Sequence, residues 1–182
     1  CKLGEGQYGH CAVRRNVGGV LKTLTYGRLC AAADDPIEKK PLYHFKPTSW
    51  ILSVATAGCN LRCINCQNWQ ISQVRPEDAR NQDLPPAKLV EVTARRKIPS
   101  IAYTYTEPVV FYEYVLDSAK RAHAEGVKNV LVTAAYIREK PLRELCRYVD
   151  AANVDLKTFS DETYKKVSKG RLGPVLNAIR VM

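Results

Sequence analysis

The chain has 182 residues, of which 46% are hydrophobic, and this fits one globular domain or part of a larger protein. Its formal net charge is +10, but the basic residues are scattered in short groups, which favours a solvated surface over a nucleic-acid interface. No apolar run approaches the ~20 residues that span a membrane. The cysteine count is seven, an odd number, and no signal peptide is visible, so a disulfide framework is disfavoured. We expect a cytoplasmic protein without membrane contacts.

Residues 1–48 differ in composition from the rest of the chain, because they contain six of its ten glycines. Apolar residues around 20–24 and 29–33 predict a small β-hairpin in this region. We expect 1–48 to be an N-terminal extension that packs on a core domain formed by 49–182.

From Trp50 onward, strand-like segments alternate with helical ones, a pattern that implies parallel strands joined by crossover helices. Glycine and proline mark several boundaries, and Gly126 is expected to cap the longest helix. The predicted strands cover about 50–56, 100–105, 129–133 and 153–157. The predicted helices cover about 85–97, 108–125, 141–149 and 174–182.

Three cysteines directly after the first predicted strand are the strongest functional signal. Cys59, Cys63 and Cys66 have the spacing C-x3-C-x2-C in the segment AGCNLRCINCQNW. Three thiolates can hold three irons of a cubic four-iron–four-sulfur (4Fe–4S) cluster, which usually takes four cysteines, so one iron is open to a substrate. A zinc site or ordinary structural thiols are the alternatives, and zinc is less favoured because 67–97 contains no fourth Cys or His ligand.

Polar side chains also follow the other three predicted strands, where parallel βα folds place their active sites. Glu107 follows the second strand, and Thr133 ends the third. Asp155 and Lys157 end the fourth, and residues two apart on a strand share a face. We therefore expect these side chains to lie near the cysteines, although each of them alone could also be a packing or surface residue.

The cysteine spacing is the signature of radical S-adenosylmethionine enzymes. The chain resembles one family of them, the radical enzyme of the AmmeMemoRadiSam system, which is related to pyruvate formate-lyase activating enzymes. The matching stretches are DPIEKKPLYHF, GCNLRCINCQNWQIS, AYTYTEPVVFYEYV and VDLKTFSDETYKKVSKGRLGPVL. The resemblance implies a partial (β/α) barrel of the radical S-adenosylmethionine type. With four βα units in place of about six, and its only Met at position 182, the chain is expected to be truncated.

The resemblance also assigns binding residues. In the family, the amino and carboxyl groups of S-adenosylmethionine bind the open iron, and a GGE-type motif at the second strand end binds the amino group. Here Tyr105, Thr106 and Glu107 take the place of that motif. A TNG-type motif at the third strand end is reduced to Thr133-Ala134-Ala135, which leaves Thr133 as the candidate.

Two further matches complete the expected site. The DLK motif supplies Asp155 and Lys157 as catalytic and cofactor-binding candidates near the S-adenosylmethionine carboxylate. Asn68 and Trp69, which follow the last cysteine of the motif, are expected to pack beside the cluster and the adenosine.

The implied activity is reductive cleavage of S-adenosylmethionine to a 5′-deoxyadenosyl radical, which then abstracts hydrogen from a substrate. The leading substrate is a protein, as in glycyl-radical activating enzymes, and the alternatives are a small molecule or RNA. A non-enzymatic iron–sulfur or zinc binding module is the interpretation from a different class. The implied partners are an electron donor such as flavodoxin or ferredoxin, and Memo-like and AMMECR1-like proteins.

Overall fold

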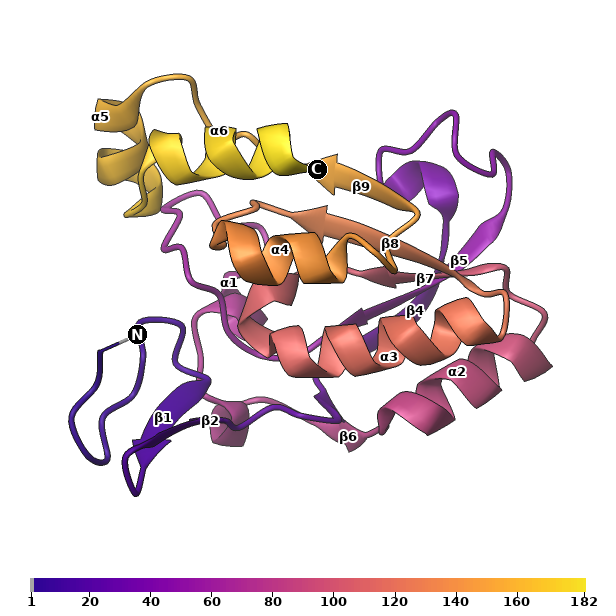
Figure 1. The fold of residues 1–182 in the computed structure, drawn as a ribbon, viewed down its shortest axis with the longest axis horizontal. Helices are drawn as coiled ribbons and strands as arrows, with labels where there is room; N and C mark the ends of the chain where they lie inside the picture. Colours follow the sequence, from indigo (N-terminus) through magenta and orange to yellow (C-terminus); the bar gives the residue numbers. More distant parts are fainter. Residues whose placement is uncertain (1) are drawn as a thin grey trace.

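The computed structural model describes residues 2–182, and its central element is a five-stranded mixed sheet (Figure 1). The strands, in spatial order, are β4 (Ala31–Pro36), β5 (Trp50–Ala55), β7 (Ser100–Tyr103), β8 (Lys128–Thr133) and β9 (Ala151–Val154). β4 pairs antiparallel with β5, and the remaining pairs are parallel. In residues 2–182 the sheet stays open, with β4 and β9 at its edges, which confirms the predicted α/β partial barrel.

The parallel strands form where the sequence has short apolar runs, and they are largely buried. Every residue of β5 except Trp50 is buried, and so is all of β7, as expected for central strands that are covered on both faces. Val54 pairs with Tyr103, Tyr103 with Leu131, and Thr133 with Val154. This register brings the carboxyl ends of the four parallel strands to the same edge of the sheet.

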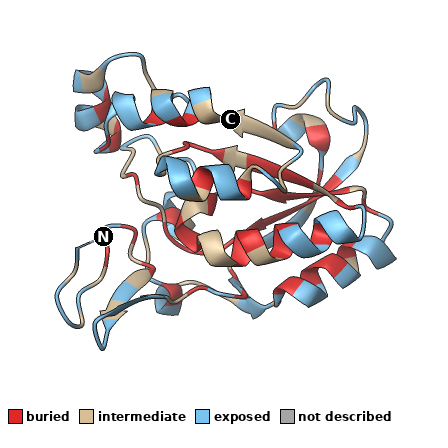
Figure 2. Cartoon of the chain, in the orientation of Figure 1, coloured by how far each residue is buried: buried red, intermediate tan, exposed pale blue. Residues whose placement is uncertain are grey.

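Helices cover one face of this sheet and bury their apolar sides against it (Figures 1 and 2). The longer helices are α2 (Pro86–Arg95), α3 (Tyr112–Ala124), α4 (Glu139–Leu145) and α6 (Leu172–Val181). The predicted helix over 108–125 is split into a 3₁₀ turn, η3 (Pro108–Phe111), and α3, and Gly126 follows α3 with φ of +73°. Within residues 2–182, none of the helices combines the length and the apolar composition that crossing a bilayer requires.

Shorter elements connect these helices and strands. They are η1 (Ile37–Lys39), α1 (Trp69–Ser72), η2 (Pro76–Asp78), α5 (Asp161–Thr163) and the π-helical turn η4 (Tyr164–Ser168). Ser160 caps α5, because its hydroxyl accepts a hydrogen bond from the Thr163 amide at 3.2 Å. The fourth parallel strand ends at Val154, three residues earlier than predicted, so Asp155 and Lys157 belong to the loop after β9.

The N-terminal region differs from the prediction in its strand pairing. β1 (Arg14–Val17) and β2 (Val20–Thr23) form the hairpin, and Gly18 and Gly19, both with positive φ, make its turn. The segment 29–33, predicted to pair with 20–24, instead contributes to β3 (Arg28–Leu29) and β4. β3 pairs with β6 (Gln82–Asp83), and β4 joins the main sheet. The division at residue 48 stays a prediction, but residues on its N-terminal side are part of the sheet.

The N-terminal region also fixes the start of the cysteine loop. Gly58 has φ of +95°, and a Cβ atom at this position would lie 2.5 Å from Val13 Cγ1 and 2.6 Å from the Cys11 carbonyl oxygen. Arg62 in the same loop donates a hydrogen bond to the His10 carbonyl at 2.5 Å. The loop between β5 and α1 is therefore packed tightly against residues 10–13.

This packing predicts that Gly58→Ala lowers the free energy of unfolding by about 2–4 kcal/mol, because it combines a strained positive φ with a steric clash. Gly126→Ala is the matched control, since Gly126 also has positive φ but a methyl group added there would meet no atom within 4 Å. We expect the control to cost only about 1–2 kcal/mol. Urea unfolding of both variants measures the difference, and equal losses would contradict the close packing at Gly58.

Candidate functional site

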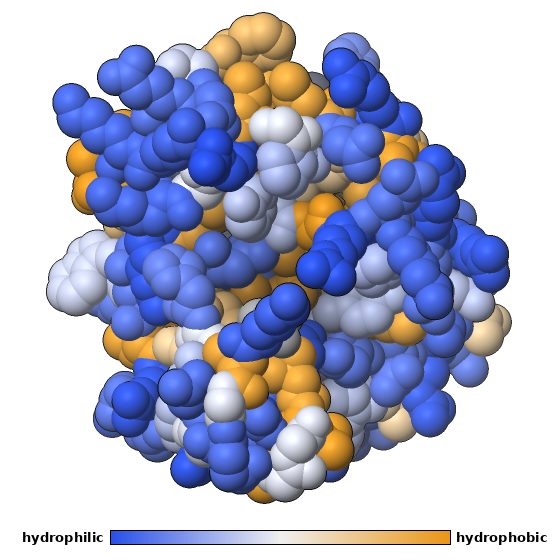
Figure 3. Space-filling model, turned by 60° about the vertical axis from the view of Figure 1, so that its left-hand side comes forward, coloured by the Kyte–Doolittle hydropathy of each residue, from blue (hydrophilic) through white to orange (hydrophobic). Residues whose placement is uncertain are grey.

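A cavity of about 620 Å³ lies at the edge where the parallel strands end. Figure 3 brings this side of the molecule forward and shows a mostly hydrophilic surface with apolar residues in its depressions. The cavity is lined by residues that follow each of the four parallel strands, and by Lys39 and Lys40 at the end of η1. Its volume is in the range of small-molecule and cofactor sites. The polar residues that the sequence places after the four strands therefore line one cavity.

The three cysteines of the motif, Cys59, Cys63 and Cys66, all line this cavity. The Leu61 amide donates a hydrogen bond to Cys59 Sγ at 3.4 Å, and Cys66 Sγ lies 3.2 Å from the Ser72 hydroxyl oxygen. Burial raises the pKa of Cys59 to about 12, and the nearby Glu107 carboxylate contributes to this increase. Cys59 is thus protonated in the metal-free protein and has to lose its proton when it ligates a metal.

The donor set fits a cluster better than a single ion. Among residues 2–182, no three Cys, His, Asp or Glu side chains converge closely enough to hold a single metal ion. A cubic iron–sulfur cluster needs a different arrangement, because each thiolate binds its own iron and the thiolates surround the cluster. All three thiols line the same cavity, as this second arrangement requires.

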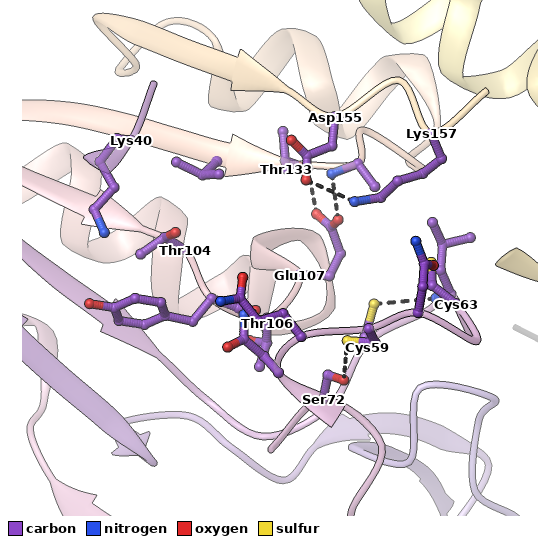
Figure 4. Close-up of a pocket in the computed structure, with 18 of the residues that line it drawn as sticks. Lys40, Cys59, Cys63, Ser72, Thr104, Thr106, Glu107, Thr133, Asp155 and Lys157 are labelled. Atoms are coloured by element: carbon purple, nitrogen blue, oxygen red, sulfur yellow. Dashed lines mark hydrogen bonds and ion pairs between the residues drawn. The ribbon is translucent and has the colours of Figure 1, made fainter. Parts of the chain in front are cut away.

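Glu107 is a buried charged residue of the cavity, with only 2% of it exposed (Figure 4). Its Oε2 accepts a hydrogen bond from the Ala134 amide at 2.8 Å, and its Oε1 accepts one from the Thr133 hydroxyl. The Val109 amide donates a longer bond of 3.4 Å to Oε1. Burial raises the pKa of Glu107, and the hydrogen bonds from Thr133, Ala134 and Val109 offset only part of that effect.

The turn before Glu107 is held in an unusual backbone conformation. Tyr105 has φ of +61°, which lies in the left-handed region that is unfavourable for residues other than glycine. Its carbonyl accepts a hydrogen bond from Asn68 Nδ2 at 2.7 Å, and the Thr106 hydroxyl donates one to the Thr56 carbonyl at 2.8 Å. Asn68 thus fixes this turn from the cysteine loop, and strained backbone of this kind is frequent at functional sites.

Asp155 and Lys157 lie at the exposed rim of the cavity. Lys157 Nζ donates a hydrogen bond to Asp155 Oδ2 at 2.8 Å. Burial lowers the pKa of Lys157, but its pairing with Asp155 and the negative potential of Cys63 and Glu107 outweigh burial and raise it. Both side chains reach the cavity from the loop after β9, so their proximity does not come from alternation along a strand.

The structure separates one predicted site residue from the others and adds two charged residues to the cavity. Trp69 is 60% exposed and lies outside the cavity wall, because it begins α1 and points to the surface. Lys39 and Lys40 line the cavity, although the sequence predicts no site for them. Both belong to DPIEKKPLYHF, a stretch that carries the family resemblance without pointing to a role for either lysine.

Comparison with known proteins identifies the family. A model of the radical SAM superfamily, where SAM denotes S-adenosylmethionine, matches residues 53–182. The chain belongs to the radical SAM superfamily. The matched region contains the three cysteines and every strand end that lines the cavity. The cofactors of this superfamily are a 4Fe–4S cluster and S-adenosylmethionine, and they are therefore the cofactors of this radical SAM domain.

Three curated relatives are similar to this radical SAM chain. An uncharacterized protein of Methanocaldococcus jannaschii is 46% identical over 181 residues, which are 100% of this chain and 54% of that protein. A GTP 3′,8-cyclase of Lactiplantibacillus plantarum is 29% identical over 132 residues, 69% of this chain and 39% of the cyclase. A GTP 3′,8-cyclase of Limosilactobacillus fermentum is 27% identical over 130 residues, 68% of this chain and 38% of the cyclase. The chain thus spans about half or less of the length of these relatives.

Among solved structures, TYW1 with a lysine–pyruvate adduct bound matches 71% of this chain and 49% of its own chain. The TM-score is 0.44, and the sequence identity is 15%.

The buried carboxylate of this radical SAM domain predicts a pH-dependent stability. Burial raises the pKa of Glu107 in the folded state above its unfolded value, near 4.5. The protonated side chain therefore contributes to the free energy of unfolding fully below the unfolded pKa, and this contribution is lost as the pH rises through the folded pKa. Relative to the wild type, metal-free Glu107→Gln should therefore gain stability between pH 4.5 and pH 7.5. Urea unfolding of both proteins at the two pH values measures this, and a pH-independent difference would contradict it.

Proposed function

We propose that Cys59, Cys63 and Cys66 ligate a 4Fe–4S cluster with one open iron, and that S-adenosylmethionine binds beside it in the cavity. The observation that carries this proposal is that the three thiols and the buried Glu107 carboxylate line one cavity. When bound, the cluster supplies the electron that cleaves the sulfonium of S-adenosylmethionine to methionine and a 5′-deoxyadenosyl radical, which abstracts hydrogen from the substrate.

Glu107 is assigned to the amino group of S-adenosylmethionine. Its two oxygens accept bonds from Thr133, Ala134 and Val109, but a carboxylate offers about four acceptor sites, so an ammonium still finds a partner. Thr133 orients the carboxylate rather than touching the ligand. Pairing of an ammonium with a buried carboxylate is charge-assisted and geometrically specific.

The other site residues surround this contact. Tyr105 and Thr106 form the turn whose backbone carbonyls share the amino group with Glu107, and Asn68 holds that turn in place. Asp155 and Lys157 are assigned to the carboxylate of S-adenosylmethionine and to the reaction centre. The positive charge of Lys157 suits the carboxylate, and its pairing with Asp155 keeps it at the rim.

The substrate follows from resemblance rather than from geometry. The four sequence stretches that resemble the AmmeMemoRadiSam radical enzyme, a relative of pyruvate formate-lyase activating enzymes, favour a protein substrate that is activated by hydrogen abstraction. The same relation suggests flavodoxin or ferredoxin as electron donor and Memo-like and AMMECR1-like proteins as partners. The similarity to GTP 3′,8-cyclases favours a second candidate, a small molecule such as a nucleotide.

The cluster assignment is tested by single substitutions of the cysteines. After anaerobic reconstitution, Cys59→Ala, Cys63→Ala and Cys66→Ala should each lose most of the bound iron and the visible absorption of the cluster. Cys146→Ala is the control, because Cys146 is a free cysteine that does not line the cavity. Full iron loading in a triple Cys→Ala variant would refute the assignment.

The role of Glu107 is tested separately from the cluster. Glu107→Gln removes the negative charge but keeps the shape, so S-adenosylmethionine affinity should fall by about tenfold or more, as expected for a hydrogen bond to a charged group. Iron content should stay at the wild-type level. Titration of reconstituted protein measures the affinity. An unchanged affinity would mean that Glu107 does not bind S-adenosylmethionine and only caps η3.

A further inference from the structure

A second group of charged side chains lies in the cavity, away from the cysteines. Asp35, at the end of β4, is buried and accepts hydrogen bonds from Lys39 at 2.6 Å, from Lys40 at 2.7 Å, and from the Tyr105 hydroxyl. Both lysines line the cavity. We propose that Lys39 and Lys40 form an oxyanion-binding subsite, which holds a carboxylate or phosphate group of the substrate.

The charges of this group do not balance. Two ammonium groups meet one carboxylate, so one positive charge remains at the cavity wall. The buried pair of Lys40 and Asp35 is already neutral, so the exposed ammonium of Lys39 is the cation in excess. An incoming oxyanion supplies the missing charge, and its attraction is strengthened where the protein excludes water.

Hydrogen-bonding capacity leads to the same conclusion. An ammonium has three N–H donors, and Asp35 takes one from Lys39 and one from Lys40. The Lys40 ammonium also lies 4.5 Å from the centre of the Tyr105 ring, which attracts a cation, while burial lowers the pKa of Lys40 and its bond to Asp35 opposes this effect. Lys39 is 58% exposed and can direct its remaining donors at a ligand. Lys40 is 2% exposed and contributes its positive charge from the protein interior.

The position of this group separates it from the site assigned to S-adenosylmethionine. Figure 4 shows Lys40 at one end of the cavity and Cys59 and Cys63 at the other, with Glu107 between them. The charges that act on Lys40 are those of Asp35 and Lys39, whereas those that act on Lys157 are Asp155, Cys63 and Glu107. The assignment to the substrate rests on the proposed function, because that function places S-adenosylmethionine at the Glu107 and Lys157 end.

The test is a titration of the cluster-reconstituted protein with inorganic phosphate and, separately, with acetate at constant ionic strength. Lys39→Met and Lys40→Met should each weaken binding of the preferred anion by about tenfold or more. Lys88→Met is the matched control, because Lys88 is also an exposed lysine paired with a carboxylate, that of Glu91, but lies outside the cavity. Since Lys40 is buried, its loss could impair folding, and the exposed Lys39 then decides the outcome.

The results show whether the subsite binds the substrate or S-adenosylmethionine. Preference for phosphate or for acetate identifies the oxyanion, and equal affinity in the wild type, Lys39→Met and Lys88→Met overturns the subsite. If S-adenosylmethionine competes with the anion, and Lys39→Met weakens both to the same extent, the subsite belongs to the cofactor and the substrate assignment is wrong. The titration is repeated on metal-free protein, so a failure of cluster loading refutes the proposed function without affecting this comparison.

Discussion

The buried carboxylate of Glu107 ties together the ends of two neighbouring strands. The residue follows β7, and its oxygens accept hydrogen bonds from Thr133 and Ala134 at the end of β8. Burial still leaves its pKa raised, so these bonds do not fully compensate the desolvation of the charge. A carboxylate kept in that condition at the centre of a cavity is better explained by the binding of a cation than by stability. The cation that we propose for it is the ammonium of S-adenosylmethionine.

The position of Glu107 depends on the parallel register of the sheet. Because β5, β7, β8 and β9 run in the same direction with matched ends, the segments that follow them meet at one edge. The cysteine loop after β5 is then fixed by contacts from outside the sheet, among them the bond from Arg62 to the His10 carbonyl. Gly58 packs against the N-terminal region, and Asn68 binds the Tyr105 carbonyl. The thiols and the carboxylate thus lie on segments that tertiary contacts hold in place, as a preorganised site requires.

Much of this arrangement was predictable from the sequence, because it depends on local signals. The runs 51–55 and 129–133 are apolar and rich in β-branched residues, and the cysteine spacing and the polar residues at the strand ends carry chemistry in short motifs. The antiparallel β4 was not predictable in the same way. Its sequence, AAADDP, contains two aspartates and a proline and is a poor strand by propensity, and it forms through long-range pairing with β5.

The site residues that the sequence missed also depend on tertiary contacts. The charged segment around Lys40 predicts a surface residue. Its burial becomes favourable only because Asp35 and the Tyr105 ring lie beside it. The closeness of Trp69 to Cys66 predicts a place at the site, but the short helix α1 turns this side chain to the surface. Sequence proximity to a motif does not determine side-chain direction.

The central claim is that S-adenosylmethionine binds in this cavity in direct contact with a cluster held by the three thiols. Electron paramagnetic resonance of the reduced, reconstituted protein, recorded with and without S-adenosylmethionine, tests it most directly. We expect the signal of a reduced 4Fe–4S cluster, and we expect this signal to change when S-adenosylmethionine is added. A cluster signal that is identical in the two samples, at a concentration of S-adenosylmethionine shown to saturate binding, would contradict it.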